Sequence, residues 1–178
     1  MITTKGKGAG GKNTNKNGLR YEELTDLKTH YVVMHQNKNS KIIKFINNDK
    51  ELVNTNKSKF FKYMDKKMDK SIMKAHGCKN PDDVYIDEEN RVIFILEMKF
   101  QQVGGSVCEK IQTPDFKKWQ YNRTFLEYEI VYIYCLSDWF KLNCQAEIEY
   151  LKYKKIPYFW GSDKNYKSNI INFIINYK

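Results

Sequence analysis

A carboxylate and an ammonium group interrupt the otherwise apolar segment VIFILEMKF, residues 92–100. An apolar, β-branched run of this length is typical of a strand buried within a sheet. Because side chains alternate across a strand, Glu97 and Lys99 share the face of Ile95, which turns polar where the strand ends. A buried ion pair often makes a fold no more stable than apolar residues at the same positions would, so this pair points to a chemical role.

An acidic residue upstream indicates what that role could be. The segment PDDVYIDEEN predicts a short strand and a tight turn before the strand that carries Glu97. The resulting hairpin would bring an aspartate, Asp82 or Asp83, close to Glu97. Two carboxylates at that distance repel each other unless a cation lies between them, and oxygen ligands suit Mg²⁺. Lys99 would then lie beside the metal, where it could orient or help to deprotonate an attacking water.

The first half of the chain is expected to supply a helix, a hairpin and a second helix. Leu19, Glu22 and Leu27 recur at helical spacing, which predicts a helix from about residue 18 to 30. The runs YVVMH and KIIKFI are typical of strands, and the turn residues NNDK join the second of them to ELV. In SKFFKYMDKKMDKSIMKAHG, apolar residues four apart predict a helix with Gly77 as its C-cap.

Strands and helices alternate in the second half. GSVCEKIQ is expected to start a helix with Ser106 as its N-cap, and Pro114 breaks or restarts that helix. The run EIVYIYCL predicts a central strand, IPYFW another strand, and residues 144–154 and 166–177 two helices. We therefore predict an α/β fold with a central mixed β-sheet flanked by helices.

The charge of the chain favours a polyanionic partner. There are 31 Lys and Arg against 21 Asp and Glu, a formal net charge of +10. Acidic membrane is a weaker candidate than nucleic acid, since no predicted helix pairs a basic face with a long face of Leu and Trp. No run approaches the roughly 20 apolar residues that span a bilayer, and the N-terminus lacks the apolar region of a secretory signal. We expect no membrane partner and a cytoplasmic location.

Composition predicts one domain with an N-terminal extension. Residues 1–18 are Gly, Lys, Asn and Thr with almost no apolar side chains, which predicts a flexible basic arm. Residues 19–178 are predicted to form a single domain.

The cysteines give no sign of a metal site. The chain has four of them without a CxxC pair: Cys78, Cys108, Cys135 and Cys144. This spacing favours reduced structural thiols over a zinc site.

The spacing of the acids and the lysine resembles the PD-(D/E)xK nuclease superfamily. Pro81 and Asp82 are followed, after a gap of 14 residues, by Glu97-x-Lys99. Within residues 13–160, the segments NKNGLRYEELT, PDDVYID, FILEMKFQ, GSVCEKIQT and VYIYCLSDWF look like those of small Type II restriction endonucleases of bacteria and large DNA viruses. The resemblance implies a restriction-endonuclease-like version of the predicted α/β fold.

The resemblance also implies roles for individual residues. Asp82 and Glu97 would be the metal ligands and Lys99 the catalytic lysine, with Mg²⁺ as the metal and Mn²⁺ as a substitute. An additional acid is expected from the first helix, where Glu22 is the match in NGLRYEE and Glu23 the alternative.

The sequence leaves open which of two aspartates is the ligand. Asp82 and Asp83 are adjacent, so they point to opposite faces of a strand and only one of them meets Glu97. We favour Asp82 because it follows Pro81; Asp83 remains the alternative ligand.

The activity implied by the resemblance is hydrolysis of double-stranded DNA at a short specific sequence, leaving a 5′-phosphate and a 3′-hydroxyl. A palindromic sequence would call for a homodimer. A cognate DNA methyltransferase is the expected functional partner, and a bacterial or viral origin is implied. Two alternatives remain open: a structure-specific DNA nuclease of the junction-resolvase or repair type, and a non-catalytic DNA-binding protein.

Several polar and basic residues are candidates for contact with DNA. Basic residues interleaved with Trp119 and Tyr121 could line a groove, although a solvated basic helix face is the alternative. The candidate DNA-contacting residues are Lys12, Lys16, Gln101, Lys110, Lys117, Lys118 and Arg123.

Overall fold

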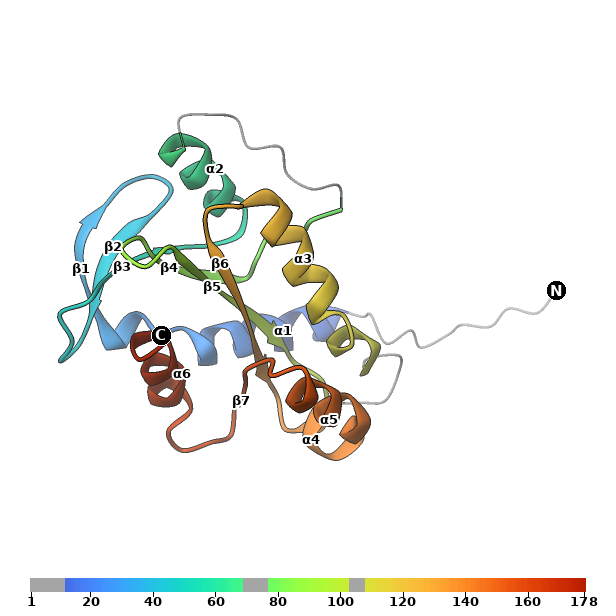
Figure 1. The fold of residues 1–178 in the computed structure, drawn as a ribbon. Coiled ribbons are helices and arrows are strands. Elements are labelled where there is room, and N and C mark those ends of the chain that lie inside the picture. The colour runs from blue at the N-terminus through green and yellow to red at the C-terminus, as the bar shows by residue number, and fades with distance from the viewer. Residues whose placement is uncertain (1–11, 69–76, 103–107) are drawn as a thin grey trace.

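A mixed β-sheet forms the centre of the protein (Figure 1). The computed structural model describes residues 12–68, 77–102 and 108–178, with residues 12–17 described by main chain only. Within these residues, seven strands lie side by side in chain order. Their bounds are β1 Tyr31–Gln36, β2 Lys41–Phe45, β3 Glu51–Thr55, β4 Asp83–Asp87, β5 Val92–Lys99, β6 Glu129–Leu136 and β7 Tyr158–Trp160.

The direction of pairing changes in the middle of the sheet. Strands β1 to β5 pair antiparallel, as successive hairpins and connections allow. Strands β6 and β7 continue the sheet in parallel to β5. Before each of them, helices carry the chain back to the end of the sheet at which the preceding strand began. The predicted α/β class and the central mixed sheet are therefore confirmed.

Helices cover both faces of this sheet. The helices are α1 Lys12–Thr25, α2 Lys57–Lys67, α3 Pro114–Thr124, α4 Trp139–Asn143, α5 Gln145–Tyr153 and α6 Tyr166–Ile175, with 3₁₀ turns at Lys28–His30 and Cys108–Ile111. Helices α2 to α5 contribute buried side chains to one face of the sheet, whereas α6 packs on the opposite face. Helix α1 crosses on the α6 side, where Tyr21 lies against Tyr166 (Figure 1).

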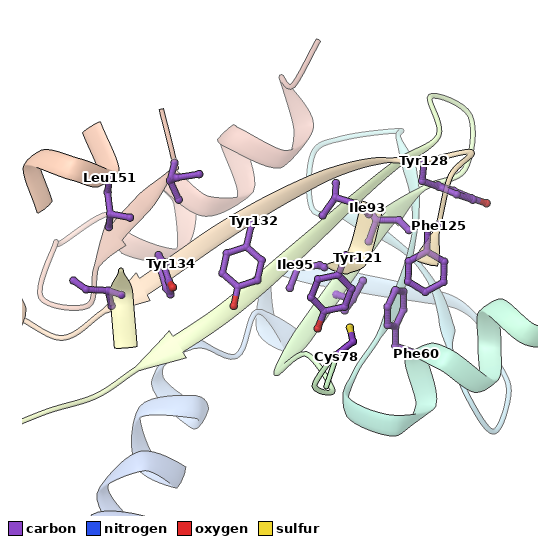
Figure 2. Packing of buried hydrophobic residues seen from close by; sticks show 14 of the residues in the cluster. Phe60, Cys78, Ile93, Ile95, Tyr121, Phe125, Tyr128, Tyr132, Tyr134 and Leu151 are labelled. Carbon is purple, nitrogen blue, oxygen red and sulfur yellow. The ribbon is translucent and has the colours of Figure 1, made fainter. Parts of the chain in front are cut away.

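Aromatic residues dominate the core beneath α2 and α3. Figure 2 shows Phe60 of α2 next to Phe125 and Tyr121 from the α3 region, over the isoleucines of β5. The ring centroids of Phe60 and Phe125 are 5.0 Å apart. This packing fixes α3 against the sheet, which matters because α3 carries one side chain of the candidate site.

The observed elements differ most from the predicted ones at three places, and the short helix α4 was not predicted. Helix α1 begins at Lys12 and ends at Thr25, so part of the predicted flexible arm is helical, because a helix once nucleated extends readily into adjoining residues. The remainder of that arm, residues 1–11, lies outside the described residues. Helix α2 ends at Lys67, so Gly77 is not its C-cap, and residues 69–76 between them lie outside the description.

The third difference lies after the central hairpin. Of the helix predicted at GSVCEKIQ, the described residues Cys108–Ile111 form a 3₁₀ turn, and the proposed N-cap Ser106 lies outside the described residues. Pro114 does restart a helix, occupying the first turn of α3, where its missing N–H is not needed. Among the described residues, no helix combines the length and the apolar character needed to cross a bilayer.

The prediction of four reduced cysteines is wrong for one pair. Cys108 and Cys144 form a disulfide between the 3₁₀ turn and the start of α5, with Cα atoms 5.5 Å apart. Their separation of 36 residues gave no local signal, because only the folding of α3 and β6 brings the two segments together. Cys78 and Cys135 are buried thiols outside this disulfide, as predicted.

The aromatic core generates a stability prediction. Phe60→Ala should lower the free energy of unfolding by about 3–5 kcal/mol, because it removes a fully buried ring and leaves a cavity. Phe116→Ala is the matched control, since that ring is 57% exposed, and it should change the value by about 0.5 kcal/mol or less. Urea unfolding followed by circular dichroism measures both; equal losses would contradict the assigned core.

Candidate active site

The β4–β5 hairpin decides which aspartate lies beside Glu97. Asp83 pairs with Leu96 and Val84 with Ile95, so the same register places Asp82 opposite Glu97. Alternation then puts Asp82 and Glu97 on one face of the sheet and Asp83 on the other. An Oδ2 atom of Asp82 accepts a hydrogen bond from the main-chain N–H of Met98 at 2.9 Å, which fixes the carboxylate at the end of β5.

The two carboxylates influence each other electrostatically. Burial and then the negative charge of Glu97 raise the pKa of Asp82, while the Met98 N–H and Lys99 act in the opposite direction. Burial also favours the neutral form of Glu97, but the charges of Lys99 and Lys117 outweigh it and hold the pKa of Glu97 below its ordinary value. The pair of acids predicted from sequence is therefore present, with two ammonium groups beside it.

Both ammonium groups contact the same carboxylate oxygen. Lys99 Nζ is 2.5 Å and Lys117 Nζ is 3.0 Å from Oε1 of Glu97. Lys99 also reaches the carbonyl oxygen of Met98 at 3.4 Å. Lys117 reaches Glu97 from α3, and burial lowers the pKa of its ammonium group. Sequence analysis placed Lys117 among residues lining a DNA groove; the structure places it within the acidic site itself.

A buried tyrosine adjoins this cluster. Among the described residues, the phenol oxygen of Tyr132 is the buried side-chain atom without a hydrogen-bond partner. Burial, followed by the charge of Glu97, raises the pKa of Tyr132 well above its ordinary value. Lys117 Nζ lies 5.6 Å from the centroid of the Tyr132 ring. Sequence reasoning missed Tyr132, because it reads as one more aromatic residue of a central strand.

A cleft of about 530 Å³ adjoins Asp82. Its walls are the exposed side of α1, the turn between β1 and β2 and the start of α2. Glu22 and Glu23 both line it, and Oε2 of Glu22 accepts a bond from Lys57 Nζ at 3.0 Å. The charge of Glu22 also contributes to raising the pKa of Asp82, although α1 crosses the sheet on the face opposite α3.

Asp83 belongs to a different hydrogen-bonded group. Its Oδ1 accepts bonds from Asn54 Nδ2 at 2.9 Å and from the N–H of Val84 at 3.1 Å. Tyr31 donates to the oxygen of the same Asn54 side chain at 3.4 Å. Burial raises the pKa of Asp83 to about 7. This carboxyl thus faces away from Glu97 and joins β4 to β3.

The remaining candidate DNA contacts lie in varied surroundings. Gln101 is 9% exposed, and its main chain is tied to the hydroxyl of Ser137. Arg123 is exposed and stacks over Trp119 at 5.1 Å. Lys118 is partly exposed and Lys110 exposed. Lys12 and Lys16 lie on α1, but their side chains are outside the described residues.

The acids do not form a tight three-ligand group. In the described part of the chain, three residues place potential metal-ligand atoms within 4.8 Å of one another: Cys108, Cys144 and Glu147. Its two sulfur atoms are joined in the disulfide, so it does not offer a thiolate site for zinc. Asp82, Glu97 and Glu22 do not converge that closely. Any metal at this site would be held mainly by Asp82 and Glu97.

Comparison with known proteins adds no relative. No protein-family model, no curated protein and no solved structure matches the chain significantly. The molecule is an α/β protein with a mixed sheet flanked by helices.

The environment of Asp83 generates a pH prediction. Its folded-state pKa of about 7 exceeds the ordinary value of 3.8, so the folded protein retains the proton that the unfolded chain loses first. The resulting stability is present at low pH and declines as the pH rises from about 4 to about 7. Asp83→Asn keeps an acceptor for Asn54 and cannot ionise, so its stability relative to wild type should increase over this range.

Urea unfolding in chelator-containing buffer across that pH range measures the effect. Asp49→Asn is the control, because Asp49 is exposed. Parallel curves for wild type and Asp83→Asn would contradict the assignment.

Proposed function

We propose that this protein is a metal-dependent endonuclease of double-stranded DNA with an active site of the PD-(D/E)xK type. The observation that carries the proposal is the placement of Asp82, one residue before β4, at the end of β5 that carries Glu97, with Lys99 bonded to the Glu97 carboxylate. A binding protein has no need of two mutually repelling acids in a partly buried site. The formal net charge of +10 suits a polyanionic substrate.

The donor set fits a hard divalent cation. Asp82 and Glu97 offer carboxylate oxygens, and the contacts with Met98 and the lysines engage one oxygen of each. The mutual repulsion that raises the pKa of Asp82 is relieved when a cation lies between the acids. Mg²⁺, or Mn²⁺ in its place, takes such ligands. When bound, it supplies Lewis-acid polarisation of a phosphate and a water molecule with lowered pKa.

The residues of the chain would divide the remaining work. Asp82 and Glu97 would hold the cation at the strand ends. The ammonium of Lys99, fixed between Glu97 and the Met98 carbonyl, is placed to orient the attacking water and offset charge on the phosphate. Glu22, which lines the cleft, would add an acidic group from α1. Water then displaces the 3′ oxygen and leaves a 5′-phosphate and a 3′-hydroxyl.

The cleft beside Asp82 is the proposed path of one DNA strand. It combines Asp82 and the acids of α1 with a wall of amides and lysines, including Asn37 and Lys38 in the β1–β2 turn and Lys57 and Lys59 in α2. Lysines would contact phosphates and amides would contact bases. One such site cuts one strand, so cutting of a palindrome calls for a homodimer. We propose a Type II restriction enzyme with a restriction-endonuclease-like fold and a cognate methyltransferase.

Digestion of a mapped plasmid in Mg²⁺, with the ends sequenced, tests the proposed function. Discrete fragments sharing a common end sequence would support cutting at a short specific sequence. Cutting confined to branched DNA added in parallel would assign the same chemistry to a structure-specific nuclease. Binding to DNA without any cutting in Mg²⁺ or Mn²⁺ would contradict the proposal.

Adjacent aspartates give a matched test of the metal ligands. Asp82→Asn and Glu97→Gln should each reduce cleavage by at least ~10²-fold, because each weakens the hold on the cation. Asp83→Asn, the same change one residue further on, should cleave close to the wild-type rate. The measurement is single-turnover cleavage in Mg²⁺. Full activity of Glu97→Gln would exclude Glu97 as a ligand.

Lys99 should act on the chemical step. Lys99→Ala is expected to lower the single-turnover rate by about 10²-fold or more, the scale of a positioned proton-transfer or charge-stabilising group. The melting temperature and the DNA affinity should change little, since Lys99 lies at the end of its strand. A large drop in melting temperature with the cleavage rate preserved would instead make Lys99 a structural residue.

A further inference from the structure

The position of Lys117 is fixed by the packing of α3. Tyr121, one turn further along this helix, is buried against Phe60, and its hydroxyl donates to the carbonyl of Lys79 at 2.8 Å. Lys117 extends from the same side of the helix toward β5. Its side chain is 25% exposed and its Nζ lies over the ring of Tyr132. The contact with Glu97 is therefore part of the packed structure.

Lys117 makes the site electrically neutral in the absence of a metal. Two negative charges, Asp82 and Glu97, are balanced by two positive ones, Lys99 and Lys117. The neighbouring acid Glu22 is balanced separately by Lys57. A divalent cation added to this cluster would leave two uncompensated positive charges in a partly buried place, where screening by solvent is weak.

Phosphodiester groups of DNA are the natural compensation for this excess of two positive charges. Each carries one negative charge, and the proposed path of the DNA strand adjoins Asp82. Metal and phosphate would then each favour the binding of the other, and such coupling is reciprocal. Glu97 also has to release one of the ammonium groups if its Oε1 is to hold the metal.

Of the two ammonium groups, Lys117 is the one suited to leave. Lys99 is two residues from Glu97 on the same strand and is also held by the carbonyl of Met98. Lys117 reaches across from a separate helix, and a rotation of its long side chain moves the charge without moving the strand.

We propose that Lys117 is a positioning residue that holds Glu97 in the free protein and couples metal binding to the arrival of DNA. In the free protein its ammonium weakens the metal site. When a phosphodiester binds, the ammonium moves from the Glu97 oxygen to the phosphate, and the carboxylate becomes available to the metal. This inference rests on the proposed metal-dependent function.

Direct titration with Mn²⁺ tests the coupling without measuring cleavage. Free Mn²⁺ is followed by electron paramagnetic resonance, in the absence and presence of dimethyl phosphate, a phosphodiester anion without bases. Dimethyl phosphate should tighten Mn²⁺ binding to the wild-type protein. Lys117→Met, which keeps a long apolar side chain, should bind Mn²⁺ about 10-fold tighter than wild type without dimethyl phosphate and respond less to it, a factor typical of coupled sites.

Three further variants separate a specific effect of Lys117 from a general effect of net charge and from loss of the metal site. Lys118→Met removes the same charge from the next position of α3 and should leave the Mn²⁺ affinity without dimethyl phosphate unchanged. Lys117→Arg keeps the charge and should retain most of the coupling. Glu97→Gln should bind Mn²⁺ much more weakly than wild type. Melting temperatures without metal check that each variant is folded.

The outcomes distinguish this inference from the proposed function. Equal Mn²⁺ affinities of wild type and Lys117→Met, with Glu97→Gln weaker than both, would overturn the role of Lys117 and leave the metal site standing. An equal gain in Lys118→Met would also overturn it, because net charge alone would then explain the effect. Absence of Mn²⁺ binding to wild type and Lys117→Met, with or without dimethyl phosphate, would overturn the metal site and the inference together.

Discussion

The register of the β4–β5 hairpin is the constraint on which the candidate site depends. It sets Val84 against Ile95 and so carries Asp82 to the position opposite Glu97. A shift by one residue would exchange the two faces, turning Asp83 toward Glu97 and the apolar side chains of β4 toward the wrong core. The register is therefore held by burial of Val84 and Ile86 on one face and of Tyr85 on the other.

The second requirement is the packing of α3 on the parallel half of the sheet. Strand β6 pairs in parallel with β5 along its whole length, placing Tyr132 beside Ile95 and Tyr134 beside Glu97. The aromatic cluster around Phe60 and Tyr121 then fixes α3 over these tyrosines (Figure 2). A helix rigid at this point can hold an ammonium group close to a carboxylate that belongs to a different element.

Such an arrangement is hard to explain by stability alone. The charges at the site are partly removed from water, which costs free energy of solvation. Their mutual attraction has to offset this cost before it adds to the stability of the fold. Apolar residues at the same positions would continue the core of that face of the sheet without this cost. The proposed function gives another reason for these charges, since a metal ion and a phosphodiester would both bind among them. The acids would bind the metal, and the lysines and the net positive charge of the chain would attract the phosphates.

The sequence by itself determined the central strands and the position of Glu97 and Lys99 on one face of β5. Alternation along VIFILEMKF places Glu97 and Lys99 together on one face, and PDDVYIDEEN predicts the hairpin, because strand periodicity and turn chemistry are local properties. Only the tertiary structure decided between Asp82 and Asp83, because register depends on which side chains the two cores bury. Likewise, only the packing of α3 and α5 revealed the contact of Lys117 with Glu97 and the disulfide of Cys108 with Cys144. Contacts between residues that are distant in the sequence leave no local pattern from which they can be predicted.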